Sequence, residues 1–260
     1  MIKKIANRVV WILVFILTMG LVIWANIEQS NTPCNNIEVL VKKTDYAPLT
    51  SKDIIKSDVI ESMPALLGQS IKNIALEDLE HLLAGNSLLS ENKTYINLNG
   101  DVCIKTTPRK AILRIFDEKG VNAYLGDKKV IMKNSPAHSQ RIIVASGHIK
   151  HVGEQEKKDI LKHQQEPPKI YNDLYKLASY INNDEFLNAL IDQIYVRKNQ
   201  EIELIPKVGV KQIIFGSAEN MDEKLENLKT FYINGEGKID WQKYQSINLK
   251  YKNQIVCSKK

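Results

Sequence analysis

The sequence has little cysteine: only Cys34, Cys103 and Cys257 occur among its 260 residues. An odd, sparse count excludes the disulfide framework of a small secreted scaffold, and the wide spacing excludes a CxxC motif. Glycine and proline are also few, at 12 and 8 residues, and no internal repeat or low-complexity tract is present. With 43% hydrophobic and 25% charged residues, the composition is that of a folded protein with its own core.

Sequence motifs of catalysis and metal binding are lacking as well. His148 and His151 are three residues apart, whereas the zinc-binding HExxH motif needs two histidines four apart with a glutamate between them. Ser146 lies outside any GxSxG elbow, and Gly126 is followed by Asp127 and Lys128 rather than by the Lys-Ser/Thr of a phosphate loop. We therefore predict no catalytic, cofactor-binding or metal-binding residues and no enzymatic activity.

A basic surface of the kind that binds nucleic acid is not indicated, although the formal net charge is +6. Lysines and arginines alternate with acidic residues along most of the chain, which is typical of a solvated face. No basic run is interleaved with aromatic residues. Nucleic acid is therefore excluded as a predicted partner.

One long hydrophobic run is present, at residues 9–25 (VVWILVFILTMGLVIWA), and it contains no charge. A helix of this length reaches the lower limit of what spans a bilayer. Trp11 and Trp24 lie near its two ends, where indole rings favour the membrane interface, so we assign them as anchor residues. The run predicts a transmembrane helix.

Basic residues precede this run at Lys3, Lys4 and Arg8, and none follows before Lys42. The positive-inside rule then places residues 1–8 in the cytoplasm and the remaining mass outside it. A cleaved signal peptide is the alternative, but it would have a shorter apolar stretch and small residues at its exit. We favour a retained, single-pass inner-membrane anchor with a periplasmic domain.

The exported part has an α+β pattern. After a polar tether at residues 26–35, residues 36–108 predict one compact β-α-α-β-β unit, with the hairpin turn Asn99-Gly100-Asp101 between its last two strands. Residues 109–260 predict a mixed β domain of largely antiparallel strands with flanking amphipathic helices. We read residues 153–168 as a polar loop or frayed helix.

The last strand of this pattern begins at Ile247 and alternates cleanly. Ile247, Leu249, Tyr251, Ile255 and Cys257 share one face, and the opposite face is polar. A final amphipathic strand is often a sheet edge, whose unpaired N–H and C=O groups can accept a strand from another protein. From the residues alone, Tyr251 is either an aromatic anchor for such a partner or a core residue.

The whole layout resembles the FtsQ/DivIB family of bacterial cell-division proteins, in its Bacteroidota form. The most specific segments are Asp184-Glu185-Phe186 through Gln193-Ile194-Tyr195-Val196, Leu204 through Gly209, Lys224 through Tyr232, and the stretch from Trp241 to Cys257. The chain departs from the family at Lys105-Thr106-Thr107-Pro108, where relatives carry Gln-Arg-x-Pro. The resemblance implies a POTRA-like first domain.

The same resemblance implies a non-catalytic scaffold of the division septum. Members bind FtsB/DivIC-like and FtsL-like proteins, in part by β-strand addition to the last strands, and thereby support the septal peptidoglycan machinery. Carried over to this sequence, it implies partner-binding residues at Asn248, Leu249, Lys250, Tyr251, Lys252 and Gln254.

Two other functions stay open at this point. One is a membrane-anchored periplasmic enzyme that acts on cell-wall material through a site assembled from distant residues, with His148 and His151 as the residues to test. The other is a POTRA-type secretion or assembly accessory that binds its clients through the first domain.

Overall fold

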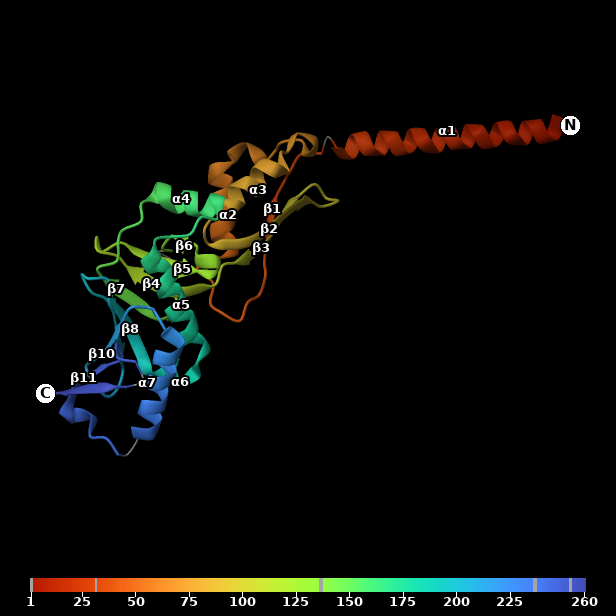
Figure 1. The fold of residues 1–260 in the computed structure, drawn as a ribbon. Coiled ribbons are helices and arrows are strands. Elements are labelled where there is room, and N and C mark those ends of the chain that lie inside the picture. The colour runs from red at the N-terminus through yellow and green to blue at the C-terminus, as the bar shows by residue number, and fades with distance from the viewer. Residues whose placement is uncertain (1, 31, 136–137, 236–237, 253) are drawn as a thin grey trace. The chain divides into compact units, whose positions relative to one another are not determined.

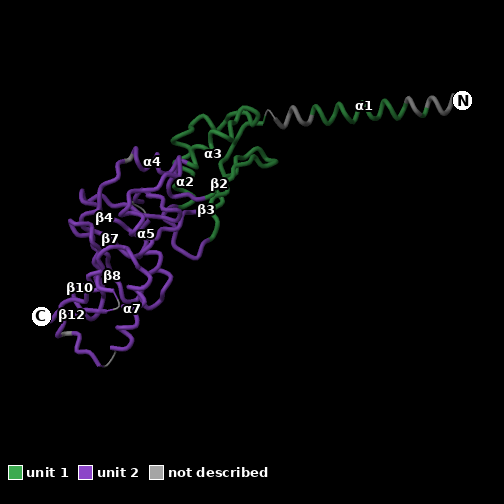
Figure 2. The backbone as a smooth tube through the Cα atoms, viewed as in Figure 1, with its two compact units in different colours: residues 1–43, 51–84, 91–107 green, residues 44–50, 85–90, 108–260 purple. Residues whose placement is uncertain are grey.

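The computed structural model describes residues 2–30, 32–135, 138–235, 238–252 and 254–260. Contacts divide the chain into two compact units, and each unit is assembled from three segments (Figure 2). Unit 1 comprises residues 1–43, 51–84 and 91–107, and unit 2 comprises residues 44–50, 85–90 and 108–260. Two short segments that precede the predicted boundary at residue 108 therefore pack with unit 2.

The apolar run lies within helix α1 (Ile2–Ser30) (Figure 1). The side chains of Trp11 and Trp24 are exposed, at 68% and 64%, as are the large apolar side chains between them. Within the described residues, no helix combines the length and the apolarity that crossing a membrane requires. The side chains of Lys3, Lys4 and Arg8 lie outside the described part. Since α1 continues to Ser30, half of the predicted tether is helical rather than irregular.

Unit 1 has the predicted β-α-α-β-β order, with its second and third strands extending into unit 2. The elements are β1 (Ile37–Val41), α2 (Lys52–Ser62), α3 (Leu76–Ala84), β2 (Leu89–Ile96) and β3 (Val102–Pro108), with 3-10 turns η1 (Pro64–Leu66) and η2 (Ile71–Asn73) between the two helices. In the three-stranded sheet β3 is central and runs parallel to β1. Ser51 caps α2 by accepting a hydrogen bond from the Ile54 backbone N–H.

Unit 2 contains a nine-stranded mixed sheet. Its strands lie in the order β12-β11-β10-β9-β8-β7-β4-β5-β6. In chain order their bounds are β4 (Ala111–Phe116), β5 (Asn122–Gly126), β6 (Ile131–Met132), β7 (Val144–Gly147), β8 (Ile191–Val196), β9 (Ile202–Pro206), β10 (Gln212–Gly216), β11 (Tyr244–Asn248) and β12 (Val256–Lys259). Five of the eight neighbouring pairs are antiparallel, and β4–β7, β7–β8 and β10–β11 are parallel. The predicted mixed, largely antiparallel sheet is confirmed.

Helices cover one face of this sheet (Figure 1). They are α5 (Lys169–Asn183), α6 (Glu185–Leu190) and α7 (Met221–Gly235), and their apolar stripes enter one buried cluster with the strand residues. Short 3-10 turns η3 (Asp127–Lys129) and η4 (Trp241–Lys243) complete the unit. Residues 154–163 form a regular helix, α4 (Glu154–His163), which resolves the two readings of this stretch in favour of the helix.

A candidate partner-binding edge of the large sheet

The predicted final strand is two strands rather than one. β11 ends at Asn248, the chain turns, and β12 begins at Val256 and pairs back on β11 in antiparallel register, with Ile247 opposite Cys257. The expectation of one continuous strand from Ile247 was therefore wrong. The period-2 pattern continues through the turn. Alternation alone does not distinguish one strand from two strands joined in register, so the pattern did not reveal the turn.

The edge of the large sheet is consequently β12. β11 is enclosed between β10, to which it runs parallel, and β12. On its outer side β12 has no neighbouring strand among the described residues. Val256 is 41% exposed, Ser258 and Lys259 are exposed, and Cys257 packs against the buried cluster, where burial raises the pKa of its thiol. Only one face of this edge is therefore committed to the core.

The six residues proposed as partner contacts separate into buried and exposed ones. Leu249 is 3% exposed and packs in the core, and its contact with a partner stays a prediction. Asn248 ends β11 and is half-buried. The side chains of Lys250, Lys252 and Gln254 are exposed, and Tyr251 is 52% exposed. Of the two alternatives for Tyr251, the core position is excluded.

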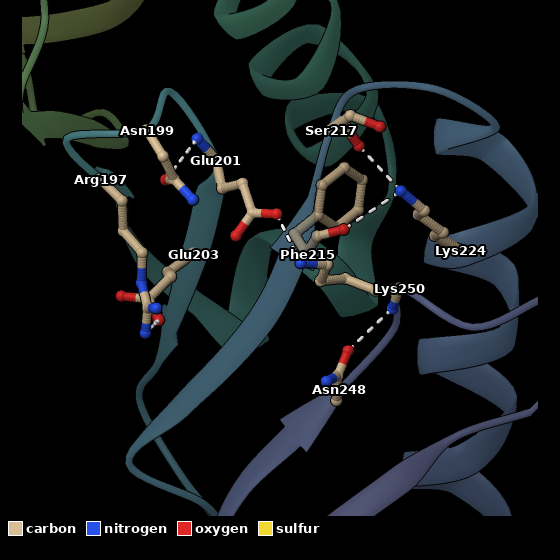
Figure 3. Close-up of polar contacts among 9 residues, drawn as sticks. All are labelled: Arg197, Asn199, Glu201, Glu203, Phe215, Ser217, Lys224, Asn248 and Lys250. Atoms are coloured by element: carbon tan, nitrogen blue, oxygen red, sulfur yellow. Dashed lines mark hydrogen bonds and ion pairs between the residues drawn. The ribbon is translucent and has the colours of Figure 1, made fainter.

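Lys250 is held against the sheet although it is exposed. Its ammonium group pairs with the Glu201 carboxylate, and its backbone N–H donates to Asn248 Oδ1 over 2.9 Å (Figure 3). The aliphatic part of its side chain covers Gly216, where an added Cβ would lie 2.8 Å from Lys250 Cγ. The hydrogen bond from Lys250 lowers the pKa of Glu201 below its ordinary value. Lys250 thus orients the loop at residues 249–255.

A second lysine supports the same region from α7. Lys224 Nζ donates to the carbonyl oxygens of Phe215 and Ser217 over 3.1 Å and 2.8 Å, and lies 4.9 Å from the centre of the Phe215 ring (Figure 3). Burial lowers the pKa of Lys224. The end of β10 is fixed in this way next to the loop.

The loop and α7 together line a small pocket that sequence reasoning did not find. Lys250, Tyr251, Lys252 and Gln254 form one side of it. The other side is formed by residues at the start of α7, namely Asn220, Glu223, Lys224 and Asn227. Amphipathic periodicity predicts α7, but it does not indicate which loop its polar face adjoins.

The histidines singled out as alternatives make local contacts. His151 Nδ1 lies 2.5 Å from Asp117 Oδ2, and Asp117 also accepts hydrogen bonds from the N–H groups of Lys119 and Val121. Burial opposes ionisation of Asp117, but these hydrogen bonds outweigh it and hold its pKa below the ordinary value. His148 is exposed. Among the described residues, no group of three or more His, Cys, Asp or Glu is placed to hold a metal ion.

Comparisons with known proteins match both parts of the chain. Residues 110–258, more than half of the sequence, match a family model described as FtsQ/DivIB, C-terminal related. Residues 32–107 match a model of the POTRA-like domain. A search of curated proteins found no match.

Proposed function

We propose that this chain, which belongs to the FtsQ/DivIB family, is a non-catalytic scaffold of the cell-division machinery that binds another division protein by accepting a strand at β12. Family membership supports the scaffold role, and both matched families are generally non-catalytic. The binding mode is β-augmentation, in which backbone hydrogen bonds supply affinity and neighbouring side chains supply specificity.

The observation that carries the proposal is the outer edge of β12, beside which no other strand of the described residues lies. In a nine-stranded sheet the edge strand presents a row of backbone N–H and C=O groups that a partner strand can pair with. Tyr251 and the polar pocket beside it lie on the loop that leads into this strand. An exposed tyrosine next to a polar pocket provides the kind of aromatic anchor that dominates many interfaces.

The partners that we propose are the small single-pass proteins of the FtsB/DivIC and FtsL types, which link the chain indirectly to septal peptidoglycan synthesis. Tyr251, Lys252 and Gln254 are the proposed contacts. Lys250 has a different role in this proposal, because its ammonium group is already paired with Glu201 and positions the loop.

We also propose that residues 9–25 anchor the chain in the cytoplasmic membrane, with the N-terminus inside, the residues that follow the anchor in the periplasm, and the protein concentrated at the septum. The support is the uncharged apolar run, its tryptophans near both ends, and the basic residues that precede it.

In-cell photocrosslinking tests the strand-binding proposal. A photoreactive residue is placed at 251, 256 or 258 of the full-length protein, and the captured protein is identified by mass spectrometry. Position 119, in the turn between β4 and β5, serves as the matched exposed control. We expect positions 251, 256 and 258 to capture one small single-pass coiled-coil division protein, and position 119 not to capture it. Absence of capture from all three positions would overturn the assignment of β12 as the binding edge.

A further inference from the structure

The segment that follows α1 is tied directly to unit 1. Thr32 O accepts a hydrogen bond from Ile71 N over 3.0 Å. Cys34 N donates to Gln69 O over 2.9 Å, and its carbonyl accepts from Gly68 N over 2.8 Å. Cys34 itself is fully buried. Residues 32–34 therefore belong to the folded unit, and only one residue separates Thr32 from the last residue of α1.

This short connection limits how far the folded part of unit 1 that follows α1 can lie from the apolar run. The five helical steps from Ala25 to Ser30 rise by about 8 Å, and the two further steps to Thr32 add about 7 Å at full extension. Thr32 therefore lies within about 15 Å of the end of the run. Each headgroup layer of a bilayer is roughly 5–8 Å thick, so a membrane that held residues 9–25 would bring Thr32 to the lipid surface or close to it.

The turn between β2 and β3 packs against this same segment. A Cβ added to Gly100 would lie 3.0 Å from Ile71 Cδ1 and 3.2 Å from Thr32 Cγ2, and Gly100 has a φ of +87° that favours glycine. At the tip of the turn Leu98 is 88% exposed, the highest exposure of any large apolar side chain described. Leu67, which precedes Gly68 in the chain, is 40% exposed.

Hydrogen bonds within the turn define its conformation and keep Leu98 at its tip. Asn97 Oδ1 accepts hydrogen bonds from the N–H groups of Asn99 and Asp101, both over 2.9 Å. Asn97 N donates to Asp101 O, and Gly100 N donates to Asn97 O. The turn thus keeps the apolar side chain of Leu98 exposed to water, where it adds nothing to the stability of the fold.

We propose that the β2–β3 turn and Leu67 form a membrane-contact surface, with Leu98 inserted among the lipid headgroups beside the emerging anchor. The inference rests on the proposed membrane anchoring of residues 9–25. The occupant is a lipid surface because the connection through Thr32 keeps this turn near a membrane that holds residues 9–25, and because Leu98 is apolar and exposed. Lys72, which follows Ile71 and is exposed, adds a positive charge that suits anionic headgroups.

Depth-dependent fluorescence quenching in reconstituted full-length protein tests this. Cys257, which is only partly buried, is replaced by serine, whereas Cys34 and Cys103 are buried and are left in place. One cysteine is then introduced at 98, 42 or 13 for labelling with an environment-sensitive fluorophore. Lys42 is the matched control, because it is an exposed residue of unit 1. It follows the last residue of β1, whereas the segment at residues 32–34 precedes the first. The vesicles contain phosphatidylcholine and phosphatidylglycerol with spin-labelled lipid as the quencher.

We expect the probes at 13 and 98 to be quenched several-fold more strongly than the probe at 42, with quenching at 98 greatest for spin labels near the headgroup. Quenching at 13 without quenching at 98 would overturn the membrane-contact surface and leave the anchor intact. Equal quenching at 98 and 42 would overturn it too, because the contact would not be specific to the turn. No quenching at 13 would overturn the anchor itself. Near-UV circular dichroism of each labelled protein checks that its fold is unchanged.

Discussion

Single residues outside the helical and strand patterns connect distant parts of unit 2, and Arg109 is the strongest example. Its side chain is 6% exposed and donates to Leu89 O over 2.7 Å, to Ser87 O over 3.0 Å and to Asp127 Oδ1 over 3.0 Å. This buried arginine directly follows Pro108. Burial of this guanidinium group is tolerated because each of its three nitrogen atoms donates a hydrogen bond to an oxygen.

We expect Arg109→Met to destabilise the protein by roughly 2–4 kcal/mol, since buried carbonyl groups left without a donor cost about 1–3 kcal/mol each. Urea denaturation followed by circular dichroism measures the loss. Lys110→Met, at the exposed neighbouring position, is the control and should change stability by less than about 0.5 kcal/mol. Equal effects of the two substitutions would show that the Arg109 contacts contribute little.

Asp184 joins two helices and gives the fold an acid-sensitive contact. Its carboxylate accepts a hydrogen bond from Lys229 Nζ over 2.6 Å and caps α6 by accepting from Leu187 N over 2.9 Å. The hydrogen bond from Lys229, followed by that from Leu187, lowers the pKa of Asp184 below its ordinary value of 3.8. A folded-state pKa below the unfolded one gives stability that is present above about pH 4. It is lost as the pH falls through the lower folded value.

We expect Asp184→Asn to keep the cap but to lose about 0.5–1 kcal/mol at neutral pH, because asparagine caps as well as aspartate but forms no ion pair. The difference from the unmodified protein should shrink as the pH falls below 3.8, the ordinary value of the side chain. Thermal unfolding between pH 7 and pH 3 measures this, with Asp192→Asn as the exposed control. A pH-independent difference would contradict the assignment.

At the scale of elements, the loop at residues 249–255 depends on a neighbouring hairpin. Glu201, between β8 and β9, holds Lys250, and Lys250 lies over the glycine that ends β10. The orientation of Tyr251 is thereby linked to strands that precede it by about fifty residues in the sequence.

Glu201→Gln removes the charge from this link. We expect amide hydrogen exchange to speed up several-fold at residues 250–252, while global stability changes by less than about 1 kcal/mol, as for a partly exposed ion pair. Hydrogen exchange monitored by mass spectrometry is the measurement, and Glu219→Gln, at an exposed position, is the control. Unchanged exchange in the loop would show that Lys250 does not depend on Glu201.

At the scale of the whole molecule, the units are interleaved along the chain rather than consecutive. Leu49 and Leu88, from the two short segments that precede residue 108, lie in one buried cluster with Ala111, Tyr124 and Met132. The carbonyl groups of Ser87 and Leu89, which accept hydrogen bonds from Arg109, belong to the second of these segments. A cut at residue 108 therefore removes part of the core of unit 2.

We expect the fragment 109–260 to lack cooperative unfolding, whereas residues 32–260 unfold with a sharp transition. The fragment lacks Leu49 and Leu88. Truncation of one buried leucine to alanine typically lowers the free energy of unfolding by about 2–5 kcal/mol, whereas the whole free energy of unfolding of a domain is about 5–15 kcal/mol. Near-UV circular dichroism and differential scanning calorimetry of both proteins measure this. A fragment that melted as sharply and at the same temperature as residues 32–260 would contradict the interleaved core.

The sequence by itself determined the elements whose signals are local. The β-α-α-β-β order, the caps at Ser51 and Asp184, and the amphipathic helices α5 and α7 follow from periods and capping groups within a few residues, which act before any tertiary contact forms. Only the tertiary structure decided that β12 is the edge, that Leu249 is buried while Tyr251 is exposed, and that residues 44–50 and 85–90 pack with unit 2. Alternation specifies the two faces of a strand, but the choice of its neighbours depends on segments far away in the sequence, and no local pattern encodes that choice.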